Sequence, residues 1–329
     1  MVAFIVRRLV SSLFIVLLVS MVVFILIRMT PGCPVSALVD QEINSRMQAG
    51  EVLDPVMQQE LMDRIFAEHG LDLPIPIQFV NWLGRMLRGD FGRSMVRNYD
   101  IRTEVGRRMA VTVYLGVLSL IVTVVLGIFL GVVAAVRNGK LIDSVVTSFG
   151  NFGMTVPAFL IAILLVWVFG FLLEWLPIWG FHLPWRGDVG QSIRRTILPV
   201  VTLSIGGIGG LSRMTRSAML DVLNADHVRT AWAKGMREKT VIFRHVMKNG
   251  LMPIVSGFGG MIRGIFGGSV VVETIFVVPG MGALLVQAMQ SNDYNVVQAT
   301  TVLLTFITVM SNLVVDLMYV WVDPRIQLA

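Results

Sequence analysis

The chain is poor in the residues that build disulfides, metal sites and soluble surfaces. Its single cysteine, Cys33, excludes an intrachain disulfide and a cysteine-rich metal site. Four histidines, far apart in sequence, give no metal-ligand spacing. Charged residues make up only 15% of the chain, whereas a soluble domain carries about 25%. We therefore expect no metal, no cofactor and no catalytic residues in this chain, and the low charge favours a membrane protein over a soluble one.

Hydrophobic residues make up 55% of the chain and lie in long uncharged runs. A helix needs about 20 apolar residues to cross the hydrocarbon core, and six runs meet or approach that length. They are Leu9 to Ile27, Val111 to Val136, Ser144 to Leu173, Thr196 to Ser212 and beyond, the stretch between Lys248 and Glu273, and Val297 to Val322. The runs predict an all-α, polytopic membrane protein with six transmembrane helices. The first run is long and no small-residue cleavage site follows it, which favours a retained anchor over a cleaved signal peptide.

The positions of the basic residues predict the orientation in the membrane. With a cytoplasmic N-terminus and six crossings, all four lysines lie on the cytoplasmic side, and 274–298 contains neither Lys nor Arg. This distribution satisfies the positive-inside rule, so we expect a multi-pass protein of the cell (inner or plasma) membrane with both termini cytoplasmic. Arg186, Arg194 and Arg195 fit this topology less well. The net charge of +6 thus reflects orientation, and no soluble region has the dense basic cluster that nucleic-acid binding needs.

Two connections are too long to be simple turns. The outer one, 29–108, should form a small extracytoplasmic cap, with one helix starting at Asp54-Pro55 and another through Phe79 and Trp82. The inner one extends over about 221–247 and is here called the inner loop.

In the inner loop, Asn224 can cap a helix, and Gly235 can supply the left-handed turn that ends it. Val228, Ala231 and Trp232 are expected to share one face of that helix. From the residues alone, this helix is either a docking surface for a partner or an amphipathic stretch resting on anionic lipid.

Short motifs along nearly the whole chain resemble one family of membrane proteins. The inner loop contains Arg229-Thr230-Ala231-Trp232-Ala233-Lys234-Gly235 and Arg244-His245, and Leu251-Met252-Pro253 follows it. In order along the chain, the other motifs are Phe4-Ile5-Val6-Arg7-Arg8, Pro31-Gly32, Gly70-Leu71-Asp72 with Pro76, Gly89-Asp90-Phe91-Gly92-Arg93-Ser94, Val156-Pro157-Ala158-Phe159, Arg213-Met214-Thr215-Arg216-Ser217, Glu273-Thr274-Ile275-Phe276, Pro279-Gly280-Met281-Gly282, Asp293-Tyr294 and Asp323-Pro324-Arg325. Together they resemble the B-type permease of the binding-protein-dependent ABC importers for dipeptides, oligopeptides and nickel.

The resemblance implies a fold, a division of the chain and a set of partners. The fold is that of a type I ABC importer permease, with an N-terminal helix at 1–28, the extracytoplasmic insertion at 29–108 and a permease core at 109–329. The partners are a second homologous permease subunit, two cytoplasmic ABC ATPase subunits that bind ATP and Mg²⁺, an extracytoplasmic substrate-binding protein and membrane lipid. The chain has no Gly-x-x-x-x-Gly-Lys-Ser/Thr phosphate loop of its own, so the ATPases are expected to be separate chains.

The resemblance also assigns the inner loop to ATPase coupling. The residues that carry it over are Val228, Ala231, Trp232, Ala233, Lys234 and Gly235. His227 and Trp232 stand where relatives usually have Tyr and Arg, and Cys33 stands where Asp is common. The docking helix is therefore expected to suit its own ATPase.

Ionisable residues inside the spans are candidates for the translocation path. Arg263 lies near the middle of the fifth run, where a charge costs about 2.5–3.5 kcal/mol, so it should line the path or pair with a polar group of another helix. Glu273 either binds the amino group of the substrate or fixes the turn toward Pro279. Asn312 and Asp316 are expected to bond between helices.

The substrate class follows only weakly from the residues. Arg263 favours a substrate with a carboxylate, so peptides are preferred; a nickel or other metal chelate, a sugar, haem and glutathione remain alternatives. A stand-alone secondary transporter or channel would not explain the basic inner loop. A membrane-embedded enzyme lacks a His/Glu or Ser/Lys constellation within the spans, and a scaffold without transport leaves Arg263 unexplained.

Overall fold

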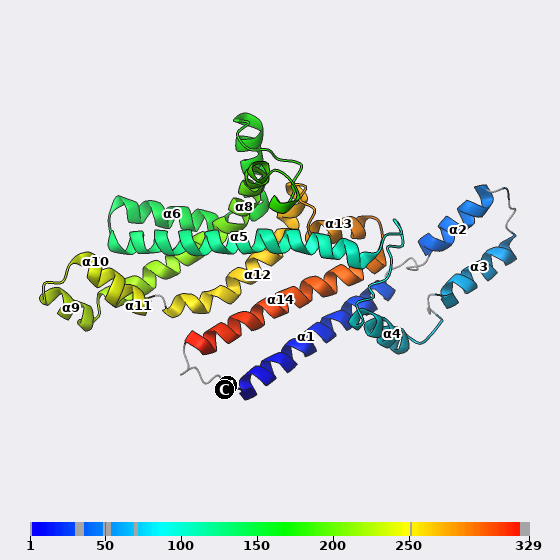
Figure 1. Cartoon of the computed structure of the whole chain (residues 1–329), viewed down its shortest axis with the longest axis horizontal. Coiled ribbons are helices and arrows are strands. Elements are labelled where there is room, and N and C mark those ends of the chain that lie inside the picture. The colour runs from blue at the N-terminus through cyan, green and yellow to red at the C-terminus, as the bar shows by residue number, and fades with distance from the viewer. Residues whose placement is uncertain are drawn as a thin grey trace. The chain divides into compact units, whose positions relative to one another are not determined.

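The computed structural model describes the backbone of residues 2–29, 36–48, 50, 54–68, 72–250 and 252–322. Most of the described residues are helical and none forms a named β-strand, with one isolated bridge between Arg93 and Asp100, which confirms the all-α prediction (Figure 1). Cys33, Gly70 and the motif at 323–325 lie outside the described residues. The chain divides into two compact units: unit 1 contains Met1–Leu9, Ala110–Ala283 and Met310–Ala329, and unit 2 contains Val10–Met109 and Leu284–Val309.

Several of the helices are long and apolar enough to span a bilayer. Four described helices meet this criterion, and they are α1 (Val2–Met29), α5 (Ile101–Val136), α8 (Val189–Leu223) and α14 (Tyr294–Val322). A bent pair, α6 (Leu141–Thr155) and α7 (Ala158–Leu165) continued by the π-helical η1 (Val166–Leu172), makes five if it is one span. Helix α12 (Met252–Ile275) covers the fifth hydrophobic run. The number six remains a prediction.

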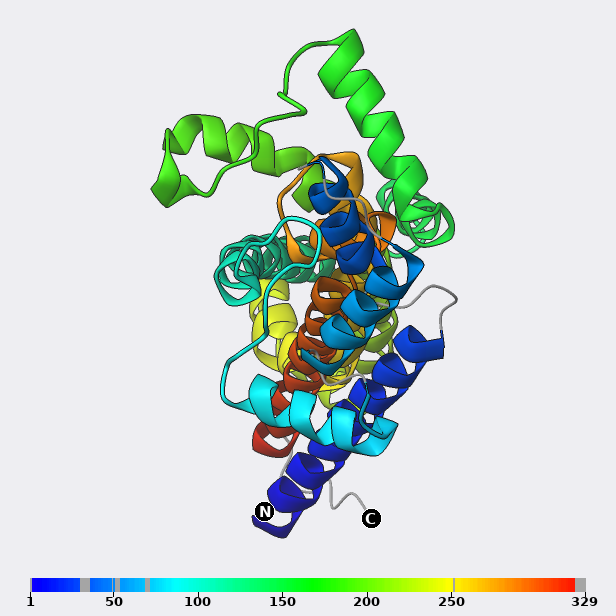
Figure 2. The ribbon, with the colours of Figure 1, turned by 90° about the vertical axis from the view of Figure 1, so that its right-hand side faces the viewer.

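The third hydrophobic run is not one straight helix, contrary to the prediction. Helix α6 ends at Thr155, the next two residues are extended, and α7 departs at 108° (Figure 2). Pro157 lacks an N–H and disfavours the helical conformation of Val156, so the backbone turns there. The run is either a broken span or a re-entrant hairpin.

Helix α8 is longer than the fourth uncharged run and continues past Arg213, as expected. Asp188 caps its start, because its carboxylate accepts hydrogen bonds from the amides of Gly190 and Gln191 at 2.7 and 3.2 Å. The connection before it contains the short helix η2 (Pro184–Arg186).

Two arginines of the first turns of α8 hold that connection in place. Arg194 donates to the Trp175 carbonyl at 2.8 Å, and Arg195 donates to the Gly180 carbonyl at 2.5 Å. Arg194 and Arg195 therefore have a local structural role. This role gives a reason for their position, which fits the positive-inside rule poorly.

Unit 1 is held together by close helix packing. Its core contains Leu115 of α5, Ala162 of α7, Leu203 of α8 and Val272 of α12. Helices α6 and α8 meet at two glycines, since a Cβ on Gly209 would lie 2.3 Å from the Gly150 carbonyl oxygen. Small residues at a helix crossing allow the two backbones to approach this closely.

The inner loop forms a compact group of short helices at the end of α8 (Figure 1). They are α9 (Asp226–Ala233), α10 (Glu238–Thr240), the π-helical η3 (Val241–Val246) and α11 (Met247–Gly250). A chain that folds back on the end of a long helix in this way presents a short structured element rather than a floppy loop.

Unit 2 contains the whole outer connection, 29–108. Its helices besides α1 and α14 are α2 (Ser36–Gln48), α3 (Pro55–Glu68), α4 (Ile75–Leu87) and most of α13 (Met281–Gln290). Helices α3 and α4 confirm the two predicted ones, whereas α2 was not predicted. Phe24 of α1 is buried against Phe79 and Trp82 of α4, with ring centroids 5.4 and 5.7 Å away, so aromatic contacts fasten α4 to α1.

Candidate functional sites

Helix α9 follows the predicted course with two corrections. It ends before Gly235, whose φ of +74° is the left-handed turn expected there. Asn224 does not cap it: the cap position is Ala225, and the Asn224 amide donates to the Leu220 carbonyl of α8 at 3.1 Å. Trp232 does not share the buried face, because 42% of it is exposed.

The buried face of α9 packs on the chain's own helices. Val228 and Ala231 are 0% and 5% exposed, and their core cluster includes Ala135 of α5, Met219 of α8 and Val241 of η3. Helix α9 therefore packs directly on the ends of α5 and α8. The four residues that follow Ala231 are exposed: Trp232, Ala233, Lys234 and Gly235.

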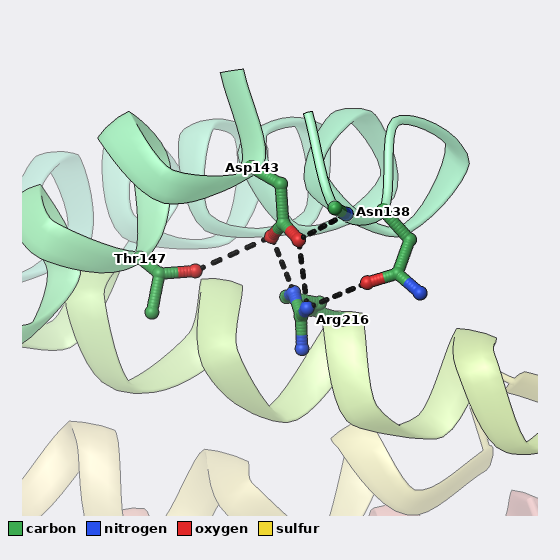
Figure 3. A network of polar contacts seen from close by, with 5 residues as sticks. Asn138, Asp143, Thr147 and Arg216 are labelled. Atoms are coloured by element: carbon green, nitrogen blue, oxygen red, sulfur yellow. Dashed lines mark hydrogen bonds and ion pairs between the residues drawn. The ribbon is translucent and has the colours of Figure 1, made fainter. Parts of the chain in front are cut away.

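A polar network holds the turn between α5 and α6 against α8 (Figure 3). Arg216 of α8 donates from Nε and Nη2 to the two carboxylate oxygens of Asp143, at 2.5 and 2.8 Å, and from Nη2 to the Asn138 amide oxygen at 2.8 Å. The Gly139 amide and the Thr147 hydroxyl donate to the same carboxylate, at 2.9 and 3.4 Å. A bidentate pair of this kind has defined geometry as well as charge.

Sequence reasoning missed this network. The sequence places Arg216 only within a motif shared with the family, and it does not single out Asp143. An available signal was the Asn138-Gly139 turn followed by an aspartate in the first turn of the next helix.

A cavity of about 420 Å³ lies among α5, α6, α7, α8 and α12 in unit 1. No described residue of its lining carries a charge; the lining is mainly glycine and aliphatic, with hydroxyls from Thr123 and Thr202. The Thr123 hydroxyl is fully buried and has no hydrogen-bond partner in the described structure. Gly264 of the Arg263 neighbourhood lines the cavity, but the Arg263 side chain lies outside the described side chains.

Glu273 is completely buried near the end of α12. Its carboxylate accepts from the Thr112 hydroxyl at 2.7 Å and from the Ala283 amide at 3.0 Å, and Thr112 accepts from the Met281 amide at 2.8 Å. These bonds fasten the turn after α12 to the start of α13 and to α5. The geometry favours the turn-holding alternative over contact with substrate.

Asp316 bonds between helices, as expected. It forms a salt bridge at 3.0 Å with Arg8 of α1.

The motif that ends at Arg93-Ser94 and the motif Asp293-Tyr294, far apart in the sequence, meet in unit 2. Asp293, at the start of α14, is buried and accepts from the Ser94 hydroxyl and, at 3.2 Å, from the Met95 amide. The Asn295 amide donates to the Arg93 carbonyl at 3.0 Å. Burial and the nearby carboxylates of Asp293 and Glu104 raise the pKa of Tyr99 above its ordinary value.

The chain is similar to known proteins over nearly its whole length. Residues 127–328 match the family described as binding-protein-dependent transport system inner membrane component, and residues 1–116 match its N-terminal membrane component. The chain is 36% identical over 324 residues to a probable peptide ABC transporter permease protein, y4tP, of Sinorhizobium fredii, covering 98% of this chain and 99% of that one. It is also 36% identical over 329 residues to the oligopeptide transport system permease protein AppB of Bacillus subtilis, covering 99% and 100%. A putative peptide permease of Brucella suis is 34% identical over 323 residues, 98% of each chain.

The matches extend over both the outer connection and the helices that surround the cavity and the inner loop, so the similarity is not confined to one motif. The chain belongs to the binding-protein-dependent transport system inner membrane components, and it is a permease subunit of an ABC importer.

Proposed function

We propose that this permease forms half of a translocation path for di- or oligopeptides. The other half is a second homologous permease, two cytoplasmic ATPases drive the cycle, and a substrate-binding protein delivers the peptide on the opposite side. Relatives that match the chain end to end are named for peptide or oligopeptide transport, which supports the substrate class.

The observation that carries the mechanism is the two-sided packing of α9. Its buried side is fixed to α5, α8 and η3, and its other side is exposed at Trp232 and Lys234. We assign this exposed side to the ATPase, so closure of the paired ATPases on ATP moves α9 and, with it, the long helices. The assignment places α9 in the cytoplasm, and with six crossings of the membrane both chain termini are also cytoplasmic.

The cavity in unit 1 is the proposed contribution of this chain to the path. Its lining is uncharged and mainly apolar, with the Thr123 hydroxyl as a polar group without a partner among the described residues. Such a lining does not select one side-chain charge, which suits peptides of varied sequence. Arg263 remains a candidate path residue beside it. Glu273 was also predicted for the path, and its hydrogen bonds support a structural role instead.

The test is to purify the intact assembly with its binding protein and measure ATPase stimulation across a substrate panel. The panel contains dipeptides, longer peptides, a nickel chelate, a sugar, haem and glutathione. Peptides should stimulate hydrolysis well above the unstimulated rate, and the other compounds should not. Stimulation only by a non-peptide would replace the substrate class, and uptake without any ATPase would overturn the importer mechanism.

A further inference from the structure

The segment 85–108 of unit 2 is unusually rich in arginine, contrary to the expectation that no region outside the spans has a dense basic cluster. It contains seven arginines, no lysine and three carboxylates, whereas all four lysines of the chain lie elsewhere. Six of the arginines are exposed, and they are Arg85, Arg88, Arg93, Arg97, Arg102 and Arg107. In the predicted topology this segment lies outside the cytoplasm, where an excess of cations is not needed for orientation.

The carboxylates of the segment are used within it. Asp90 accepts from the Gly92 amide at 3.0 Å, and Asp100 accepts from the Thr103 amide and hydroxyl at 3.1 and 2.6 Å. Glu104 pairs with Arg108 at 2.6 Å and with Arg107 at 3.7 Å. Among the described residues, no carboxylate forms a salt bridge with the remaining exposed arginines.

The fold gathers four of those arginines on one small structure. The bridge between Arg93 and Asp100 folds the segment back on itself, with Arg97 in the turn between them. A Cβ on Gly89 would lie 3.8 Å from a guanidinium nitrogen of Arg102, which places the turn at Arg88 beside Arg102. We call Arg88, Arg93, Arg97 and Arg102 the arginine surface.

The arginine surface stands on a rigid base. The buried Ser94–Asp293 hydrogen bond and the Asn295–Arg93 bond join it to the start of α14. A surface held in this way can present guanidinium groups with little loss of backbone entropy on binding.

We propose that the arginine surface is a docking site for an acidic face of the substrate-binding protein; this inference rests on the proposed function. Guanidinium groups bind carboxylates in a bidentate manner that lysine cannot reproduce. This fits a segment whose basic residues are all arginines. An anionic lipid surface is the other source of negative charge. It fits less well, because in the described stretch between Arg88 and Arg102 the only exposed large hydrophobic side chain is Val96; Leu87, just before this stretch at the end of α4, is also exposed, and segments that rest in lipid insert a broader apolar face.

The experiment uses the complete assembly in liposomes and titrates the binding protein while ATP hydrolysis is measured. Arg97→Glu with Arg102→Glu should raise the half-saturating concentration of binding protein about tenfold, with the maximal rate unchanged, because charge reversal weakens the encounter and docking. Arg97→Lys with Arg102→Lys should give a smaller rise, since charge is kept and bidentate geometry is lost. Added salt should weaken wild-type docking more than docking of the Glu variant. Arg186→Glu, an exposed arginine outside this surface, is the matched control and should behave as wild type.

The outcomes separate this inference from the proposed function. If the binding protein fails to stimulate even the wild-type assembly, the proposed function fails with it. If it stimulates wild type and the Glu variant at the same half-saturating concentration, the arginine surface is not a docking site. A rise that vanishes in liposomes without anionic lipid assigns these arginines to lipid and also overturns the inference.

Discussion

At the scale of single residues, Asp143 and Arg216 form an ion pair between α6 and α8. Side-chain exposure is 8% for Asp143 and 28% for Arg216. Arg216→Ala leaves a nearly buried carboxylate without its cation, which costs about 3–5 kcal/mol when both partners are buried. Because Arg216 is partly exposed, we expect a smaller loss of stability, about 2 kcal/mol. A shorter half-life of the assembly in detergent at a fixed elevated temperature would reveal it.

The neighbouring arginine provides the control for that prediction. Arg213 is exposed and lies one turn earlier in α8, so Arg213→Ala should leave the half-life unchanged. The double variant Asp143→Ala with Arg216→Ala should lose less than the sum of the two single variants, because the single changes strand a partner. Additive losses would show that the two side chains do not act as a pair.

Glu273→Gln tests which of the two roles of this buried residue is correct. Glutamine keeps the shape but has one acceptor oxygen in place of two, so either Thr112 or the Ala283 amide loses its acceptor. An unsatisfied buried donor costs about 1–3 kcal/mol, and we expect that loss of stability with the apparent KM for substrate unchanged. A changed KM at unaltered thermal stability would contradict the turn-holding role and restore the path role.

At the scale of helices, α9 is expected to separate coupling from folding. Trp232→Ala should lower substrate-stimulated ATP hydrolysis severalfold while thermal stability stays at the wild-type value, because the side chain is 42% exposed. Val228→Ala, on the buried face, should instead destabilise the loop by about 2 kcal/mol. Equal effects of the two changes on stability and on ATPase activity would refute the division of α9 into a packed side and a docking side.

The crossing of α6 and α8 depends on the absence of side chains at two glycines. Gly209→Ala would place its Cβ 2.3 Å from the Gly150 carbonyl oxygen, and overpacking of this kind costs about 1–3 kcal/mol. Gly210 is the matched control, since a Cβ there meets nothing within 4 Å, and alanine favours a helix by up to about 1 kcal/mol. Thermal denaturation of both variants should therefore shift in opposite directions, and a stable Gly209→Ala protein would argue against close packing.

The sequence predicts those helices whose signal is local. Long uncharged runs located α1, α5 and α14, and Asp54-Pro55 located α3, because length, caps and proline act within a few residues. Helix α2 was missed because it lacks an apolar stripe; an ion pair between Glu42 and Arg46 at 3.0 Å supports it instead.

The same distinction applies to the sites. The left-handed turn at Gly235 could be predicted because glycine alone permits it cheaply. Asp143 and Arg216 are 73 residues apart in sequence, so their pairing depends on how the helices pack. The outward turn of Trp232 also depends on packing, since α5, α8 and η3 decide which side of α9 is buried.

At the scale of the whole molecule, orientation is the property that joins the inner loop to the ATPases and the arginine surface to the binding protein. Replacing Cys33 by Ser gives a chain without cysteine, into which Lys234→Cys or Trp179→Cys can be introduced; both positions are exposed. A membrane-impermeant maleimide applied to intact cells should label Trp179→Cys and leave Lys234→Cys unlabelled until the membrane is opened, because the positive-inside rule predicts that the lysine-bearing connections face the cytoplasm. Labelling of both cysteines in opened membranes shows that each is reactive. The reverse pattern in intact cells would place α9 on the side away from ATP, and neither the coupling role of Trp232 nor the docking role of the arginine surface could then hold.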